Sequence, residues 1–497
     1  MLEDLLATHF GYQSFRPGQK EILLHLQKRE NTIGILPTAG GKSLIYQIYQ
    51  YLNPGPILLI SPLLALMEDQ VSQLQALGFK ASVAITSQLS KQEKNWLLHH
   101  LHDFQFIIMS PEMLSQPAVL RRLRQIAIKL MVIDEAHCIS QWGYDFRPEY
   151  SALRQFRQDL NHPLTLALSG SASQNTLAEI AQHLFSDWES YKQVQCPLDR
   201  PNLFYGQLRL NEKDKFHHLN SLLETLPKPG IIYVHNKMEL EELYQDLKAS
   251  SQLKLASYHA DKTSEERLQV QEQFQKGHLD AILATSAFGM GINQANVRFV
   301  IHYHAPQSLA DYLQESGRCG RDGQEALVLL YSNPQEISRL NYFKEQIDAQ
   351  AVPFYQGLNQ AYKRADFLQS QTFLALEEQI QNLITYFYYN YSPQDKKQIQ
   401  KEFQNYQKIK KNEIEQMIQY LILNSCYRRY LISHFSKEWI STNRFCCSHC
   451  QADFEDTVTF KEYLTLAPKR LVNPKEKVLK DWRARLNVLF PSYEWFN

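Results

Sequence analysis

The sequence predicts an α/β fold with two parallel-sheet lobes, followed by a mostly helical segment. Continuous apolar runs recur along the first two thirds of the chain with helix-like stretches between them, as in parallel sheets covered on both faces. The pattern pauses at Asp199-Arg-Pro-Asn202 and then restarts. At 497 residues the chain exceeds a single core, and a prior of about 150 residues per domain gives about three units.

Composition places the chain in the globular class. It is 44% hydrophobic and 21% charged, which excludes the disordered, collagen-like and membrane classes. The 52 Lys and Arg residues balance 52 Asp and Glu residues, so any basic groove for a polyanion has to be local. Because no charged-then-apolar leader and no long apolar run is present, we expect a cytoplasmic protein.

The first segment, residues 10–19, precedes a helix expected from about Lys20 to Gln27. Tyr12 and Arg16 are suited to sandwich a purine ring, and the Gln19 amide can both donate to and accept from adenine. Simple packing of an aromatic turn against a helix would explain the same residues.

A phosphate-binding loop is predicted at Pro37-Thr-Ala-Gly-Gly-Lys-Ser43. It follows a strand and opens a helix that runs through Tyr51, and loop amides at such a helix N-terminus attract phosphate. Lys42 would reach the terminal phosphates and Ser43 would offer a hydroxyl to magnesium. Thr38, Gly40 and Gly41 complete the predicted loop. The strict pattern has a glycine at position 36, where this chain has leucine.

Five apolar runs predict the strands of the first lobe: residues 32–36, 57–60, 106–109, 130–133 and 164–168. Small polar or acidic residues follow four of them, at Ser61, Ser110, Asp134 and Ser169. Open parallel sheets bind ligands at the carboxyl ends of their strands, so these residues are expected to line a crevice.

The stretch Asp134-Glu-Ala-His137 supplies two carboxylates where a buried strand surfaces. A nucleotide triphosphatase needs one acid to hold magnesium and one to orient the attacking water, and an acidic turn capping a strand is the plainer alternative. The aromatic segment that follows is predicted to stack nucleic-acid bases. Its residues are Trp142, Tyr144, Phe146 and Arg147.

A second lobe is expected from about 206 to 335. Its predicted strands are residues 230–234, 255–258, 280–284, 298–303 and 326–331. It has no phosphate loop, but Gln314-Glu-Ser-Gly-Arg-Cys-Gly-Arg-Asp322 places Arg318 and Arg321 among glycines. An ATP site on one lobe gains from a guanidinium donated by another, although a surface helix with spaced arginines is also possible.

Together these motifs resemble the RecQ-type DNA helicases of superfamily two. The resemblance covers about residues 8 to 335 and rests on the first segment, the aromatic segment, Ala287-Phe-Gly-Met-Gly-Ile292 and the arginine motif. It implies two RecA-like lobes that close on ATP and magnesium, move 3′ to 5′ along single-stranded DNA and separate the duplex. Ser169-Gly-Ser-Ala172 stands where the family usually has Thr-Ala-Thr-Ala, and Tyr144 where it often has histidine.

The resemblance also implies a role for each motif residue. Tyr12, Arg16 and Gln19 would hold adenine, and Lys42 and Ser43 would bind phosphates and magnesium. Asp134 would bind magnesium and Glu135 would position water. The second lobe would contribute Gln314, Arg318 and Arg321, with Arg321 as the arginine finger.

The remainder of the chain is predicted to be helical and to bind zinc. Aromatic residues at helical spacing in 374–389 are expected in a core, and the cysteines crowded at 446, 447 and 450 favour a metal over a disulfide. Cys447 and Cys450 have the two-residue spacing of a zinc site, and Cys426 lies about twenty residues before them. Counting from the family pattern puts the fourth ligand at Asp453, with Cys446 or His449 as substitutes.

The expected domains are 1–205 (ATP-binding lobe), 206–335 (second lobe), 336–455 (helical zinc-binding subdomain) and 456–497 (a short tail). The 42 residues after 455 cannot supply the winged helix and small helical DNA-binding domain of longer relatives, so the chain resembles a short bacterial form.

We expect an ATP-dependent 3′ to 5′ DNA helicase of repair or recombination. The alternatives are a DNA-stimulated translocase with little unwinding and a non-catalytic DNA-binding scaffold. Expected cofactors are ATP, Mg²⁺ and structural Zn²⁺. Expected partners are single-stranded and forked DNA, together with single-strand-binding or recombination proteins, for a monomer at the bacterial nucleoid without membrane contact.

Overall fold

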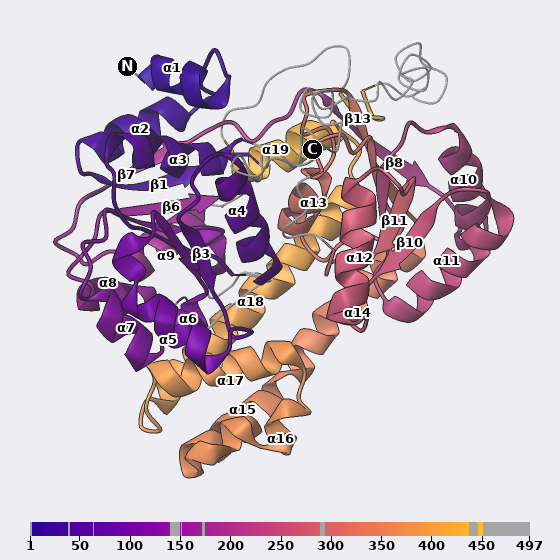
Figure 1. Cartoon of the computed structure of the whole chain (residues 1–497). Helices are drawn as coiled ribbons and strands as arrows, with labels where there is room; N and C mark the ends of the chain where they lie inside the picture. Colours follow the sequence, from indigo (N-terminus) through magenta and orange to yellow (C-terminus); the bar gives the residue numbers. More distant parts are fainter. Residues whose placement is uncertain are drawn as a thin grey trace.

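A computed structural model describes residues 2–37, 40–62, 64–139, 150, 152–170, 174–288, 294–436 and 446–450. Two α/β lobes lie beside each other, and a run of helices extends away from them (Figure 1). The first lobe is the indigo and violet part of the chain, and the orange helices run below it (Figure 1). This arrangement confirms the predicted fold class.

Within the described residues, the first lobe is a seven-stranded sheet of order β3-β4-β2-β5-β6-β1-β7, and all its pairings are parallel. Its strands are β1 (Asn31–Ile35), β2 (Ile57–Ile60), β3 (Ser82–Ile85), β4 (Phe106–Met109), β5 (Leu130–Ile133), β6 (Thr165–Ser169) and β7 (Tyr191–Gln195). Every residue of β2, β4 and β5 is buried, which is why these strands are continuous apolar runs.

The helices of this lobe cover the two faces of the sheet. They are α1 (Leu2–Leu5), α2 (Gln19–Gln27), α3 (Lys42–Leu52), α4 (Leu64–Ala76), α5 (Lys91–His99), α6 (Pro111–Leu114), α7 (Pro117–Leu123), α8 (Leu153–Asp159) and α9 (Gln174–Leu184). Each face of the sheet has its own core, because alternate residues of each strand point to opposite faces. One of these cores continues into the second lobe and α18 (Lys396–Leu421).

The second lobe, between residues 203 and 332 of the described chain, is a six-stranded parallel sheet of order β10-β11-β9-β12-β13-β8. Its strands are β8 (Leu203–Arg209), β9 (Gly230–Tyr233), β10 (Leu255–Tyr258), β11 (Ala281–Ala284), β12 (Phe299–His302) and β13 (Ala326–Ser332). Its helices are α10 (Glu212–Thr225), α11 (Lys237–Ser250), α12 (Ser264–Gln275) and α13 (Leu309–Ser316).

Three strands were missed by the sequence prediction, and each is an edge strand. β3 and β7 end the first sheet and β8 ends the second. The first three residues of β7 are exposed, so this strand lacks the continuous apolar run that marks its neighbours. In β8 the apolar residues are interrupted by Gly206 and Gln207, so this strand also lacks a continuous apolar run.

The third part of the chain is helical, as predicted. It consists of α14 (Pro334–Ala349), α15 (Ala351–Lys363), α16 (Gln371–Leu374), α17 (Glu378–Asn390), α18 (Lys396–Leu421) and α19 (Tyr427–Phe435). Phe354 of α15 stacks on Phe403 of α18 at 4.1 Å in a core of its own, and Tyr386 and Phe387 of α17 are buried in it. The expectation that the aromatics of 374–389 form core is therefore confirmed for these two residues.

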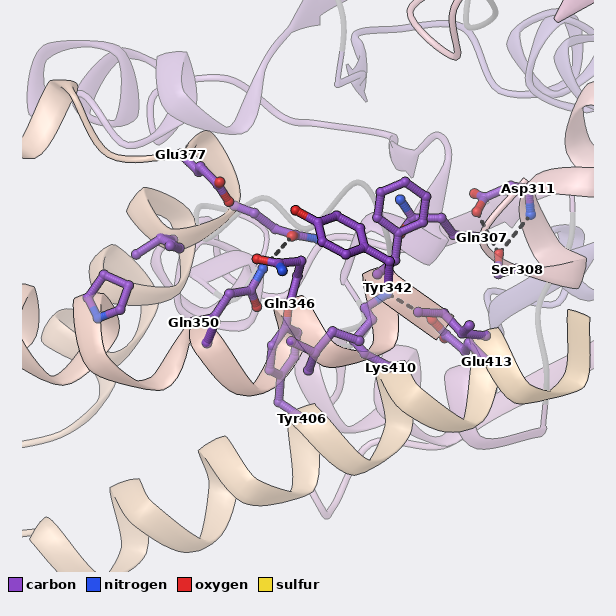
Figure 2. A pocket seen from close by; sticks show the side chains of 17 residues that line it. Gln307, Ser308, Asp311, Tyr342, Gln346, Gln350, Glu377, Tyr406, Lys410 and Glu413 are labelled. Atoms are coloured by element: carbon purple, nitrogen blue, oxygen red, sulfur yellow. Dashed lines mark hydrogen bonds and ion pairs between the residues drawn. The ribbon is translucent and has the colours of Figure 1, made fainter. Parts of the chain in front are cut away.

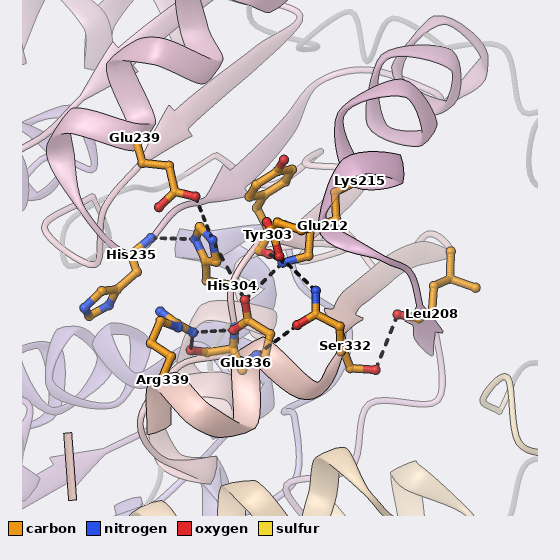
Figure 3. A network of polar contacts seen from close by, with 12 residues as sticks. Leu208, Glu212, Lys215, His235, Glu239, Tyr303, His304, Ser332, Glu336 and Arg339 are labelled. Atoms are coloured by element: carbon orange, nitrogen blue, oxygen red, sulfur yellow. Dashed lines mark hydrogen bonds and ion pairs between the residues drawn. The ribbon is translucent and has the colours of Figure 1, made fainter. Parts of the chain in front are cut away.

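Polar contacts fix α14 to the second lobe (Figure 3). The Lys215 side chain is fully buried, and its Nζ donates to Glu336 Oε1 at 3.0 Å and lies 3.0 Å from Glu212 Oε2. Glu336 Oε2 accepts from the Ala305 amide at 2.9 Å and from Arg339 at 2.5 Å. Because the buried ammonium neutralises the buried carboxylate, this network holds the first turn of α14 against the sheet.

A groove of about 390 Å³ lies where α13, α14, α17 and α18 meet (Figure 2). Amides and hydroxyls such as Gln346, Gln350 and Tyr406 line it, and its buried Lys410 is paired with Glu413 at 2.9 Å. The groove marks the junction between the second lobe and the helical segment.

Candidate functional site

The register of the first sheet brings the predicted ATP-site residues to one edge. Ile60 of β2 is level with Ile133 of β5, and Ile35 of β1 is level with Ser169 of β6. The residues after these positions therefore emerge together, and the Asp134 amide donates to the Ile60 carbonyl at 2.9 Å. These positions are the strand ends that the sequence analysis expects to line a crevice.

The phosphate loop has a backbone that requires its glycines. Gly41 caps the N-terminus of α3 at φ 69°, a left-handed conformation. A Cβ on Gly40 would lie 2.8 Å from the Pro37 carbonyl oxygen. Leu36, which replaces the glycine of the strict pattern, is fully buried in a core of the lobe. Lys42 and Ser43 occupy the first turn of α3, and Thr38 lies outside the described residues.

Lys42 makes an ion pair with the acids that follow β5. Its Nζ lies 2.9 Å from Glu135 Oε1 and 3.8 Å from Asp134 Oδ1. Burial raises the pKa of Asp134. Burial acts the same way on Glu135, but the Lys42 ammonium outweighs it and lowers the pKa of Glu135 to about 2. The site therefore holds a strongly ionised Glu135 beside a more easily protonated Asp134.

Glu135 has an unusual backbone. Its φ is 47°, which is uncommon for a residue with a side chain, and its amide donates to Asp134 Oδ1 at 3.0 Å. Such conformations persist where the surrounding structure enforces them, and they concentrate at functional sites. Here the bend turns both carboxylates toward Lys42.

Two residues that the sequence analysis missed hold the acids in place. Gln70 of α4 donates from Nε2 to Asp134 Oδ2 at 3.0 Å. His137 Nδ1 lies 3.0 Å from Ser169 Oγ and 3.4 Å from Glu135 Oε2, so it links the acids to the end of β6. His137 had a possible signal, since it closes the Asp-Glu-Ala-His string, whereas nothing near Gln70 in the sequence marks it.

The first segment is attached to the phosphate loop. Gln19 is buried, and its Nε2 donates to the carbonyl oxygens of Gly40 at 2.9 Å and Gly41 at 3.0 Å, while its Oε1 accepts from the Arg16 amide at 2.9 Å. Both ends of this amide are thus engaged within the protein. Tyr12 is 55% exposed, which leaves its ring accessible for stacking.

The second lobe brings its arginines to the acids of the first. Arg318, only 6% exposed, helps to lower the pKa of Glu135. Burial and the neighbouring Arg318 lower the pKa of Arg321 to about 10, while Glu135 opposes this change. Arg321 therefore stays cationic at neutral pH. Gln314 is half-buried on α13.

Four thiols gather at the end of the described chain. The Sγ atoms of Cys426, Cys446, Cys447 and Cys450 lie within 4.8 Å of one another. Cys426 Sγ is 3.6 Å from Cys446 Sγ and 3.8 Å from Cys447 Sγ. A tetrahedral zinc with bonds of about 2.3 Å needs thiolates about 3.8 Å apart, so the set fits zinc. Cys446, one of the two substitutes named for the fourth ligand, thus completes a set of four thiols. Asp453 lies outside the described residues.

The four residues of the predicted base-stacking segment also lie outside the described residues: Trp142, Tyr144, Phe146 and Arg147.

The two lobes and the facing lysine, acid and arginine groups define a nucleotide-dependent helicase core. The DEAD/DEAH box helicase family matches residues 16–180, and the helicase conserved C-terminal domain matches residues 214–323. A helicase Lhr of Mycobacterium smegmatis, solved with single-stranded DNA and AMP-PNP, has a TM-score of 0.56 at 21% identity over 66% of this chain and 47% of its own, which shows the shared fold.

Relatives with higher identity narrow the class. The probable ATP-dependent DNA helicase RecS of Bacillus subtilis is 34% identical over 98% of both chains. The ATP-dependent DNA helicase RecQ of the same organism is 37% identical over 69% of this chain and 58% of its own. The chain belongs to the RecQ-type ATP-dependent DNA helicases. In the part of the chain that the structure describes, no helix is long and apolar enough to cross a membrane.

Proposed function

We propose that this protein hydrolyses ATP to move 3′ to 5′ along single-stranded DNA and to separate duplex DNA during repair or recombination at the bacterial nucleoid. The observation that carries the proposal is the facing arrangement of Lys42, Asp134 and Glu135 on one lobe and Arg318 and Arg321 on the other. Phosphoryl transfer depends mostly on positioning and charge neutralisation, and these groups supply both.

Each group has a proposed task. Lys42 leaves Glu135 to hold the terminal phosphates, and the loop amides at the N-terminus of α3 hold the others. The carboxylate of Asp134 and the hydroxyl of Ser43 are hard oxygen donors of the kind that suit magnesium, which when bound neutralises phosphate charge. Glu135 orients the attacking water, and Arg321 stabilises the charge of the transition state as an arginine finger.

Adenine is proposed to stack between Tyr12 and Arg16. Because the Gln19 amide bonds to Gly40 and Gly41, its proposed role at adenine requires an exchange of these bonds when nucleotide binds. Binding of adenine would then release Gly40 and Gly41 of the phosphate loop from Gln19. Gln314 is proposed as a further contact from the second lobe.

The aromatic segment is proposed to couple DNA to the ATP site. It begins seven residues after Glu135, so a base stacked on it can shift the catalytic carboxylates. Stacking on one aromatic ring is worth roughly 1–3 kcal/mol, so Trp142→Ala should weaken DNA binding about tenfold. Coupling requires a larger loss of ATP turnover even at saturating DNA. Equal turnover of Trp142→Ala and the parent at saturation would show that the segment only binds.

The cysteine cluster is proposed to hold a structural zinc ion, since four protein ligands leave no open position for a substrate. We also propose domain boundaries near residues 205, 335 and 455. Monomeric action with single-strand-binding or recombination proteins as partners is likewise proposed.

The direction of movement is tested by displacement of streptavidin from biotinylated oligonucleotides. The proposal requires ATP-dependent displacement from the 5′ end and much slower displacement from the 3′ end. The opposite preference would reject the direction, and no displacement with active hydrolysis would also reject translocation. A scaffold without catalysis would show neither displacement nor hydrolysis, and the complete set of charged groups argues against it.

A further inference from the structure

The cysteine cluster is attached to the second lobe through its edge strand. The Tyr205 amide of β8 donates to the Cys446 carbonyl at 3.2 Å, and the Ser448 amide donates to the Tyr205 carbonyl at 3.1 Å. The Gln207 amide donates to Ser448 Oγ at 3.0 Å. Residues 446–448 therefore lie along the otherwise unpaired side of β8.

The helix that begins after Cys426 reaches the linker between the lobes. Arg428 of α19 is fully buried. Its Nε donates to Asp199 Oδ1 at 2.8 Å, and its Nη atoms donate to the carbonyls of Leu203 at 2.9 Å and Arg200 at 2.6 Å. A buried guanidinium with three hydrogen-bond partners in residues 199–203 fixes the linker tightly.

The linker in turn holds the loop that carries the arginine pair. Arg200 donates from Nη1 to the Gly317 carbonyl at 3.0 Å and from Nη2 to the Gly320 carbonyl. Asn202 Nδ2 also donates to the Gly320 carbonyl, at 2.8 Å. The Gly317 carbonyl is the one that Arg321 Nε approaches at 3.5 Å. Arg200 thus binds the backbone at Gly317, directly before Arg318, and at Gly320, directly before Arg321.

We propose that Arg200 is a positioning residue for the arginine finger, and that Arg428 holds Arg200 in place from the cysteine subdomain. This inference rests on the proposed role of Arg321. The subdomain that carries the cysteine cluster then influences the ATP site through Arg428, the linker residues 199–203 and Arg200. A displacement of about 1 Å of a catalytic group can cost about a hundredfold in rate. Loss of the Arg200 hydrogen bonds should therefore have a measurable effect.

The test is a double-mutant cycle on transition-state binding. The Kd of ADP–aluminium fluoride, which mimics the transferring phosphoryl group, is measured with saturating DNA for the parent, Arg200→Gln, Arg321→Ala and the double variant. We expect Arg200→Gln to weaken this binding by about a hundredfold in the parent. In the Arg321→Ala background, Arg200→Gln should change the Kd of ADP–aluminium fluoride by less than about twofold.

Three further measurements separate positioning from general damage. AMP-PNP affinity should stay near the parent value in Arg200→Gln, since ground-state binding does not use the finger. Arg200→Lys keeps the charge but lacks the planar fork of the guanidinium, so it should give an intermediate loss. Arg428→Lys should reproduce the direction of Arg200→Gln. The control Arg157→Lys, at a buried arginine of the first lobe bonded to Glu189, should lower Tm without coupling to Arg321.

Several outcomes would overturn the inference. Equal losses from Arg200→Gln in both backgrounds would show that Arg200 does not act through Arg321. An equal loss of AMP-PNP affinity in the well-folded Arg200→Lys would show general damage to the site. If Arg321→Ala itself leaves ADP–aluminium fluoride binding unchanged, the proposed finger is wrong, and this failure is distinct from a failure of the relay.

Discussion

The substitution Glu135→Gln should tighten nucleotide binding while it stops hydrolysis. In the structure Lys42 is held at 2.9 Å by Glu135, the same lysine that the phosphates require. Burial raises the pKa of the Glu135 carboxyl, but Lys42 and His137 together lower it to about 2. A hydrogen bond between charged groups of this kind contributes about 1.5–3 kcal/mol.

Nucleotide binding has to overcome this interaction. Glutamine keeps the shape of the side chain and can still accept a hydrogen bond from Lys42, and Asp134 remains 3.8 Å from the ammonium. Only part of the free energy of the Lys42–Glu135 interaction is therefore released, and we expect AMP-PNP to bind about tenfold more tightly, or about 1.4 kcal/mol. Loss of the group that orients water should reduce hydrolysis by on the order of a thousandfold.

The assay is competition of AMP-PNP against a fluorescent nucleotide, with and without Mg²⁺, next to hydrolysis at saturating DNA. Asp134→Asn is the matched control and should weaken binding only when Mg²⁺ is present. Because burial raises the pKa of Asp134, affinity in Mg²⁺ should fall as the pH is lowered through that pKa, and affinity without Mg²⁺ should not. Weaker AMP-PNP binding to Glu135→Gln than to the parent would refute the exchange of Lys42 between Glu135 and phosphate.

Three other predictions follow from the site, the cysteine cluster and the α14 network. Arg321→Ala should reduce DNA-stimulated hydrolysis by about a thousandfold or more at unchanged AMP-PNP affinity, because its charge is used in the transition state. Metal analysis should find one zinc per chain, which Cys446→Ser loses and Asp453→Asn keeps, since four thiols already form the set. Glu336→Gln should lower the free energy of unfolding by about 3 kcal/mol in denaturant titration, because the buried Lys215 loses its buried partner.

Each of these has a contrary outcome. Undiminished hydrolysis by Arg321→Ala would reject the two-lobe site, and a folded protein without metal would reject the zinc proposal. Asp261→Asn removes an exposed pair with Lys237 and should change the unfolding free energy by less than about 1 kcal/mol. If Asp261→Asn and Glu336→Gln lower the free energy of unfolding equally, the buried network contributes no more to stability than an exposed ion pair.

The fold was predictable from sequence wherever strands are buried on both faces. Runs such as 130–133 and 299–301 are apolar throughout because helices cover them. The edge strands β3, β7 and β8 escaped because their apolar runs are short or interrupted, as by Gly206 and Gln207 in β8. Strand β8 matters most, since the cysteine cluster docks on it.

The chemical groups of the site were predictable, but their supports were not. Lys42 and Glu135 carry motifs, and the parallel register brings them together. Gln70 and Arg200 make their contacts through tertiary packing over long sequence separations, so no local pattern marks them. Counting from the family pattern gave Asp453, whereas in the structure the Cys446 thiol lies with the other three.

Strand displacement on tailed duplexes is the most direct test of the proposal that the protein uses ATP to separate duplex DNA. Duplexes with a 3′ tail, a 5′ tail or a fork are incubated with the parent protein and with Glu135→Gln, with and without ATP. We expect ATP-dependent separation of the 3′-tailed and forked substrates by the parent, little separation of the 5′-tailed substrate, and none by Glu135→Gln. Separation by Glu135→Gln at the parent rate, or by the parent without ATP, would contradict the proposal.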